Sequence, residues 1–142
     1  MRLEPMINSG SIQELPLFVR EQVRDLIRAR GITEFWTESY WSYRSDFEET
    51  RRFFEVDTHL FLGVETFDDN IRNKTLNKSM HWADADEVRR YTDSICLMVG
   101  LRGQTQEIIR RDIDLLVTKF KYGIVNLFSA NRLSDGRMDE EI

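Results

Sequence analysis

The sequence has 142 residues, of which 41% are hydrophobic and 32% are charged, and its formal net charge is −5. This size and balance are typical of one globular domain and exclude a disordered or fibrous chain. The acidic charge argues against a general affinity for nucleic acids. A single cysteine, Cys96, excludes an internal disulfide framework and any multi-cysteine metal site built from this chain alone.

The first residues of the chain and the length of its apolar runs indicate where in the cell the protein is expected. No apolar run approaches the roughly 18 residues that a membrane-spanning helix needs. The opening residues, MRLEPMINSG, lack the charged and then apolar layout of a secretory signal. We therefore expect a cytoplasmic protein without a membrane segment.

Five apolar stretches are predicted to be strands, near residues 3–7, 33–37, 59–64, 95–99 and 124–128. The third and fourth are apolar on both faces, as in the strands of a parallel sheet covered by helices. Helical periodicity fills the segments between them: the first helix should begin at Pro16 and end at Gly31, and the last should begin near Thr105. SDFE (45–48) and DADE (84–87) have the capping-box pattern. The chain therefore predicts an α/β fold in the order βαβαβαβαβ.

Ligands of such folds bind beyond the carboxyl ends of the strands, where the loops are free to carry function. Glu65 follows the third strand, so its carboxylate would accept hydrogen bonds there from a diol or an ammonium group. A turn cap or an ion pair with a nearby lysine explains Glu65 equally well. Glu38, in FWTESYW, has the same two interpretations, and its aromatic neighbours favour the structural one.

Two glycine-containing loops also follow strands. In VGLRGQT (99–105) the glycines allow backbone N–H groups to approach a ligand, although the loop matches neither common nucleotide-phosphate pattern and a plain left-handed turn explains it as well. NSGS (8–11) offers backbone and hydroxyl donors, as many structural Ser-Gly loops do. His59 and His81 have no partner at ligand spacing in the sequence, so no metal site is predicted.

Taken together, LFLGVETFDDNIRNKTLNKSM and ICLMVGLRGQTQEIIRRDIDLL resemble the radical S-adenosylmethionine superfamily. Its members show a strand ending in G-[VIL]-[EQ]-[ST], then an Asn-Arg or Asn-Lys-Gly element, and later G-[LF]-P-G-[EQ]-T before a helix. INSGSIQELP and TESYW are most similar to the branch of queuosine-related, archaeosine-related and other tRNA-modifying enzymes. The resemblance covers nearly the whole chain and implies a single domain, 1–142, with the fold of a partial (βα)6 TIM-like barrel.

The family's activity depends on a 4Fe-4S cluster held by C-x3-C-x2-C after the first strand. The resemblance implies an enzyme that cleaves S-adenosylmethionine to a 5′-deoxyadenosyl radical, which takes a hydrogen atom from the substrate. This sequence lacks the cysteine triad, and its strands look like the family's second to sixth. We therefore expect Met1 to be an internal methionine, the first βα unit and the cluster to belong to a longer chain, and this chain to be inactive alone.

The resemblance also assigns cofactor-binding residues, but no catalytic residue and no metal ligand. Glu65 matches the residue that bonds the ribose, Lys78 matches a basic residue that holds the methionine carboxylate, and Glu38 matches an acidic position facing the cofactor. The remaining matches are the loop that contacts the methionine amino group and the turn near the adenine: Asn8, Ser9, Gly10 and Ser11, then Gly100 and Leu101. Arg102 in place of proline and Cys96 in place of aspartate depart from the family pattern.

A second hypothesis is a degenerate module that binds a nucleoside or a protein partner without chemistry. The missing βα unit would leave an exposed edge strand, which a dimer would cover. A small hydrolase has little support because no G-x-S-x-G elbow occurs. The substrate is left open, with tRNA and nucleosides among the classes that such enzymes use.

Overall fold

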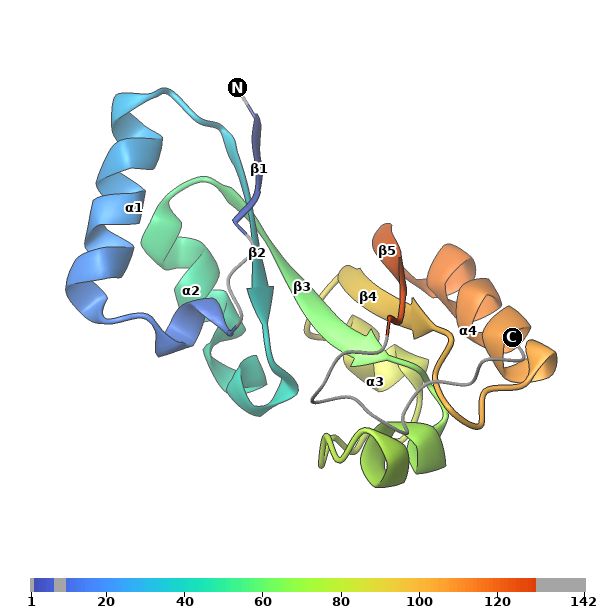
Figure 1. Cartoon of the computed structure of the whole chain (residues 1–142). Coiled ribbons are helices and arrows are strands. Elements are labelled where there is room, and N and C mark those ends of the chain that lie inside the picture. The colour runs from blue at the N-terminus through green and yellow to red at the C-terminus, as the bar shows by residue number, and fades with distance from the viewer. Residues whose placement is uncertain (1, 7–9, 130–142) are drawn as a thin grey trace. The chain divides into compact units, whose positions relative to one another are not determined.

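The computed structural model describes residues 2–6 and 10–129 of the chain. Its internal contacts gather into two compact units, Met1–Gly63 and Val64–Ile142, and each is described by itself. Both alternate strands with helices, which confirms the predicted α/β class (Figure 1). The single domain and the barrel stay predictions. In the described part of the chain, no helix is both long and apolar enough to cross a membrane.

The first unit holds three parallel strands. They are β1 (Arg2–Met6), β2 (Glu34–Ser39) and β3 (Asp57–Glu65), whose last two residues belong to the second unit. β1 pairs with β2, and β2 pairs with β3 in a register from Glu34↔Asp57 to Ser39↔Leu62. Phe35, Trp36, Leu60 and Leu62 are almost fully buried and belong to the core.

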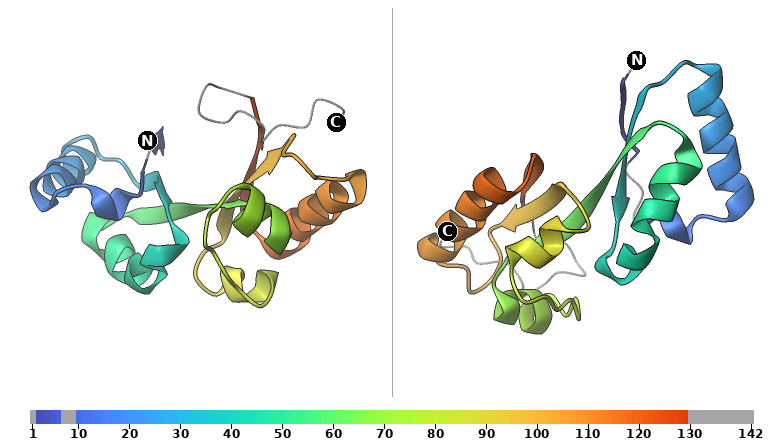
Figure 2. Two further views of the ribbon diagram at one scale, coloured as in Figure 1. Left: turned by 60° about the horizontal axis from the view of Figure 1, so that its bottom comes forward. Right: turned by 180° about the vertical axis from the view of Figure 1, so that it is seen from behind.

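Helices α1 (Leu17–Ala29) and α2 (Phe47–Phe54) lie on the same side of these strands (Figures 1 and 2). Short 3-10 helices precede them, η1 (Ile12–Glu14) and η2 (Trp41–Asp46). α1 ends where predicted, since Gly31 has a left-handed φ of 61°. The capping box predicted at 45–48 is wrong: η2 runs directly into α2, and Asp46 makes no side-chain cap.

The second unit contains two parallel strands, β4 (Ser94–Val99) and β5 (Tyr122–Leu127). Helix α4 (Gln106–Lys119) packs against both strands, and α3 (Ala85–Arg89) packs against α4. A π-helical turn, η3 (Ile71–Thr75), follows β3. The predicted cap at Asp84 is confirmed, since its side chain accepts a hydrogen bond from the N–H of Glu87 at 2.9 Å. Thr105, near which the last helix was expected to begin, also caps its helix and accepts a hydrogen bond from the N–H of Ile108 at 3.3 Å.

Candidate functional site

Glu65 and Lys78 form an ion pair in the second unit. The Nζ atom of Lys78 donates to Oε1 of Glu65 at 2.8 Å, and the two side chains are 32% and 10% exposed. Glu65 is the last residue of β3, and Lys78 lies at the far end of the loop that follows. The structure thus brings together the two residues to which the resemblance assigned the ribose and the methionine carboxylate. It also shows the lysine partner that the structural alternative for Glu65 expected.

The backbone around this pair adopts left-handed conformations that residues other than glycine usually avoid. Glu65 has a φ of 64°, and the two neighbours of Lys78, Asn77 and Ser79, have φ values of 52° and 50°. Left-handed non-glycine residues each cost of order 1 kcal/mol and persist only where surrounding contacts impose them. Such residues cluster at ligand-binding sites. The strain, together with the position of Glu65 at the carboxyl end of a strand, makes this pair the strongest candidate site.

Asp112, from α4, anchors the first residues of the same loop. Its carboxylate accepts a hydrogen bond from the Thr66 hydroxyl at 2.5 Å and one from the Phe67 N–H at 3.2 Å. Burial raises the pKa of Asp112, opposed by the hydrogen bond from Thr66 and by the charge of Arg111. The signal in the sequence was only an aspartate beside the apolar stripe of a helix, and it did not identify this contact.

The turn at Gly100 and Leu101 ends β4 with a left-handed glycine, whose φ is 97°. The backbone N–H groups of both residues donate to Oε1 of Gln104 at 3.0 Å, and Gln104 donates in turn to the carbonyl of Met98 at 2.8 Å. Gln104 is buried. Of the two interpretations of this loop, these bonds support the plain left-handed turn, because an internal side chain occupies the N–H groups that a ligand would approach. The assignment of Gly100 and Leu101 to the cofactor stays a prediction.

Of the loop predicted at residues 8–11, Asn8 and Ser9 lie outside the described residues, and Gly10 and Ser11 belong to the first unit. Ser11 is fully buried and starts η1 with a capping box, in which its N–H donates to Oε2 of Glu14 at 3.0 Å. The Ser11 hydroxyl donates to the Gln13 side chain and lies 3.1 Å from the Ser39 hydroxyl. These atoms hold the local structure together.

Glu38 lies near the end of β2, half-buried and in register with Phe61 of β3. Among its aromatic neighbours, Trp41 is buried in the core, whereas Tyr43 is half-buried and its hydroxyl donates to Oε1 of Glu14 at 3.3 Å. Trp41 is thus a core residue, and the role of Glu38 itself stays a prediction.

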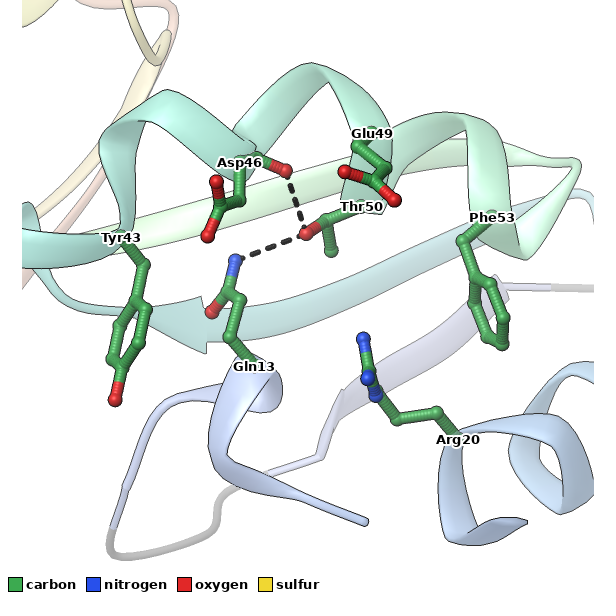
Figure 3. A pocket seen from close by; sticks show the side chains of 7 residues that line it. All are labelled: Gln13, Arg20, Tyr43, Asp46, Glu49, Thr50 and Phe53. Atoms are coloured by element: carbon green, nitrogen blue, oxygen red, sulfur yellow. Dashed lines mark hydrogen bonds between the residues drawn. The ribbon is translucent and has the colours of Figure 1, made fainter. Parts of the chain in front are cut away.

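Figure 3 shows a cavity of the first unit, with a volume of about 260 Å³. Its floor contains a chain of hydrogen bonds: Gln13 donates to the Thr50 hydroxyl at 3.1 Å, and that hydroxyl donates to the Asp46 carbonyl at 2.8 Å. None of the predicted site residues lines it. Its lining comes from η1, α1, η2 and α2: Gln13, Arg20, Tyr43, Asp46, Glu49, Thr50 and Phe53.

A cluster that sequence reasoning missed lies at the beginnings of β2 and β3. Nε2 of His59 is 3.4 Å from Oε1 of Glu34 and 3.3 Å from Oδ2 of Asp57. The imidazole is buried and stacks on the Trp36 ring with centroids 3.9 Å apart. Strand register brings these residues together, so their sequence spacing gave no signal. The group lies at the strand ends opposite to those where ligands of such folds bind.

The side chains of this chain fit one of the two implied cofactors. A carboxylate and an ammonium group held at the end of a strand match the hydroxyl and carboxylate groups of S-adenosylmethionine. They do not fit an iron-sulfur cluster, which needs several thiolates, because Cys96 is the sole cysteine and is buried within β4.

No family model and no curated protein matches the chain. A solved structure of a queuine lyase from Clostridium spiroforme, bound to SAM and queuine, is similar to it with a TM-score of 0.91 and 36% sequence identity. The match covers 96% of this chain and 59% of that chain, so the chain spans somewhat more than half of that protein's length. The agreement in both sequence and backbone shows common descent. The chain therefore belongs to the radical S-adenosylmethionine superfamily, on a queuosine-related branch.

Proposed function

We propose that this chain is the S-adenosylmethionine-binding core of a radical enzyme. The observation that carries the proposal is the 36% identity, over almost the whole chain, to a queuine lyase whose structure contains SAM. The whole enzyme would use the cofactor as a source of a 5′-deoxyadenosyl radical that takes a hydrogen atom from the substrate. We extend the proposal to a cytoplasmic location and to the partial (βα)6 barrel.

Glu65 and Lys78 would contact the cofactor directly. The Glu65 carboxylate would accept hydrogen bonds from the ribose hydroxyls, and the Lys78 ammonium group would pair with the methionine carboxylate. In the free protein they pair with each other at 2.8 Å, so binding exchanges one charge-assisted contact for contacts of the same type. Pairing also keeps both partly buried charges compensated until the cofactor arrives.

The remaining contacts come from the family resemblance. Asn8, Ser9, Gly10 and Ser11 would contact the amino group of the cofactor, Glu38 would face it, and Gly100 and Leu101 would lie near the adenine. Because Gln104 occupies the N–H groups of the last two residues, we propose contact through their other atoms.

The substrate class follows by analogy with the neighbour, which is bound to queuine. We propose a free modified base or nucleoside of that kind as the substrate, with tRNA as the alternative. Binding of queuine without turnover in the full-length protein would favour the alternative of a binding module without chemistry. Pairing of the edge strand between two copies in solution would favour a module that a dimer completes.

Calorimetric titration of S-adenosylmethionine onto the full-length, cluster-loaded protein tests the assignment. We expect Glu65→Ala and Lys78→Met each to weaken binding about ten-fold or more, because each removes a charge-assisted contact. Glu55→Ala and Lys74→Met are the matched controls. Glu55 is also a left-handed glutamate paired with a cation, Arg28, and Lys74 is an exposed lysine of the same loop as Lys78. Unchanged affinity in both site variants would sink the proposal.

A further inference from the structure

One guanidinium group holds both ends of the loop that joins Glu65 to Lys78. Arg72, in η3, is 1% exposed. Its Nη1 donates to the carbonyl of Thr66, which directly follows Glu65, at 2.9 Å, and its Nε donates to the carbonyl of Met80, two residues after Lys78, also at 2.9 Å. The two ends are thus tied by a side chain from the middle of the loop.

Asn73, the next residue, bonds the same end of the loop. Its Nδ2 donates to the Met80 carbonyl at 2.8 Å, and its Oδ1 accepts from the Met80 N–H at 2.7 Å. The N–H and the carbonyl of Met80 are therefore both hydrogen-bonded, and the carbonyl accepts hydrogen bonds from two side chains. We call Arg72 and Asn73, with these bonds, the loop brace.

The position of Arg72 is itself fixed. Its third donor, Nη2, bonds Oδ1 of Asp69 at 2.9 Å, and the guanidinium lies 3.8 Å from the centre of the Trp82 ring. A buried cation is retained only where hydrogen bonds and charge compensate for the loss of water. Here two carbonyls, one carboxylate and one aromatic face provide that compensation.

We propose that Arg72, assisted by Asn73, is a positioning residue for the cofactor site. The inference rests on the proposed function. Glu65 and the residues flanking Lys78 have left-handed backbones, which would relax if the loop were free. The brace opposes that relaxation at both ends and keeps the carboxylate and the ammonium group 2.8 Å apart. Arg72 touches neither of them and acts through the backbone.

Arginine suits this role better than lysine. The planar guanidinium presents donors in fixed directions, so one group bonds Thr66, Met80 and Asp69 together. A lysine at this position keeps the charge but presents a single ammonium group on a flexible stem. Arg72→Lys therefore preserves the buried cation and removes the geometry of the brace.

The test measures the affinity for S-adenosylmethionine in the full-length, cluster-loaded protein. We expect Arg72→Lys to weaken binding about ten-fold, as removal of a supporting group commonly does. In a Lys78→Met background, Arg72→Lys should cause a smaller loss than it causes alone, because one of the two groups that it positions is already gone. A merely structural role would give losses that add. Arg44→Lys is the matched control, since Arg44 also bonds a carbonyl and lies over a tryptophan, at 3.1 and 4.6 Å, in the other unit.

Circular dichroism checks that each variant is folded. If Arg72→Lys does not fold, Asn73→Ala replaces it in the same cycle, because Asn73 is only half-buried and its loss frees the Met80 backbone. Full affinity in the folded Arg72→Lys protein, or losses that add to that of Lys78→Met, would overturn this inference and leave the proposed function intact. Full affinity in both Glu65→Ala and Lys78→Met would overturn the proposed function, and the brace with it.

Discussion

Single residues carry the conformational cost of the candidate site. Glu65, Asn77 and Ser79 have a positive φ. Only glycine adopts this conformation without a clash of its side chain, and none of the three is glycine. At Glu65 the side chain is the functional group, so a glycine there would lose the carboxylate. At Ser79 the side chain is exposed, and nothing described in the structure requires it.

Ser79→Gly should therefore stabilise the protein by about 0.5 kcal/mol, since the relief of left-handed strain exceeds the extra entropy of glycine in the unfolded chain. Urea unfolding followed by circular dichroism measures the change. Ser42→Gly is the control with opposite sign: Ser42 is exposed within the helical turn η2, where glycine should cost up to about 1 kcal/mol. Destabilisation by both substitutions would show that Ser79 is not strained.

At the scale of elements, one buried glutamine determines how β4 passes into α4. Gln104 accepts hydrogen bonds from two successive N–H groups and donates to a carbonyl, so it completes three backbone bonds where the strand pairing ends. The glycines of VGLRGQT indicated a turn. They did not indicate the role of Gln104, which depends on its side chain turning back toward the backbone of that turn.

Gln104→Leu should destabilise the protein by about 3 kcal/mol, because it leaves buried backbone donors and an acceptor without partners. The midpoint of urea unfolding tests this. Gln106→Leu, at the exposed first residue of α4, is the control and should change stability by less than about 0.5 kcal/mol. Equal effects at the two positions would contradict the role assigned to Gln104.

For the whole molecule, the pH dependence of stability should report the buried carboxyl of Asp112. Burial raises its pKa above the ordinary value of 3.8, so the folded state holds this proton more tightly than the unfolded state does. The stability contributed by the protonated carboxyl is fully present below pH 3.8. It is lost as the pH rises through the pKa of the folded state.

Asp112→Asn has no such proton to lose. The free energy of unfolding of the wild type, minus that of this variant, should therefore fall as the pH rises from 3.8 and level off above the folded-state pKa. Urea unfolding of both proteins between about pH 3.5 and 7 measures the difference. A difference that grows with pH would mean that the pKa of Asp112 is lowered on folding.

Much of the fold was predictable because local patterns determine it. Each observed strand overlaps its predicted range, α1 begins after Pro16 and ends before Gly31, and Asp84 and Thr105 cap their helices. These features depend on hydrophobic periodicity and on contacts within a few residues. The error at 45–48 has the same origin, because the capping pattern SDFE cannot reveal that the preceding turn is already helical.

The sequence by itself determined the parallel α/β class, the strand ends and, through its motifs, the superfamily and the candidates Glu65 and Lys78. Only the tertiary structure decided that these two pair, that Arg72 and Asn73 hold their loop, that Gln104 occupies the turn at Gly100, and that His59 meets two carboxylates. The physical reason is that periodicity, caps and turns follow from the spacing of residue types along the chain. These contacts depend instead on the direction in which each side chain folds back onto its own loop, as at Gln104, or on the register of neighbouring strands, as at His59.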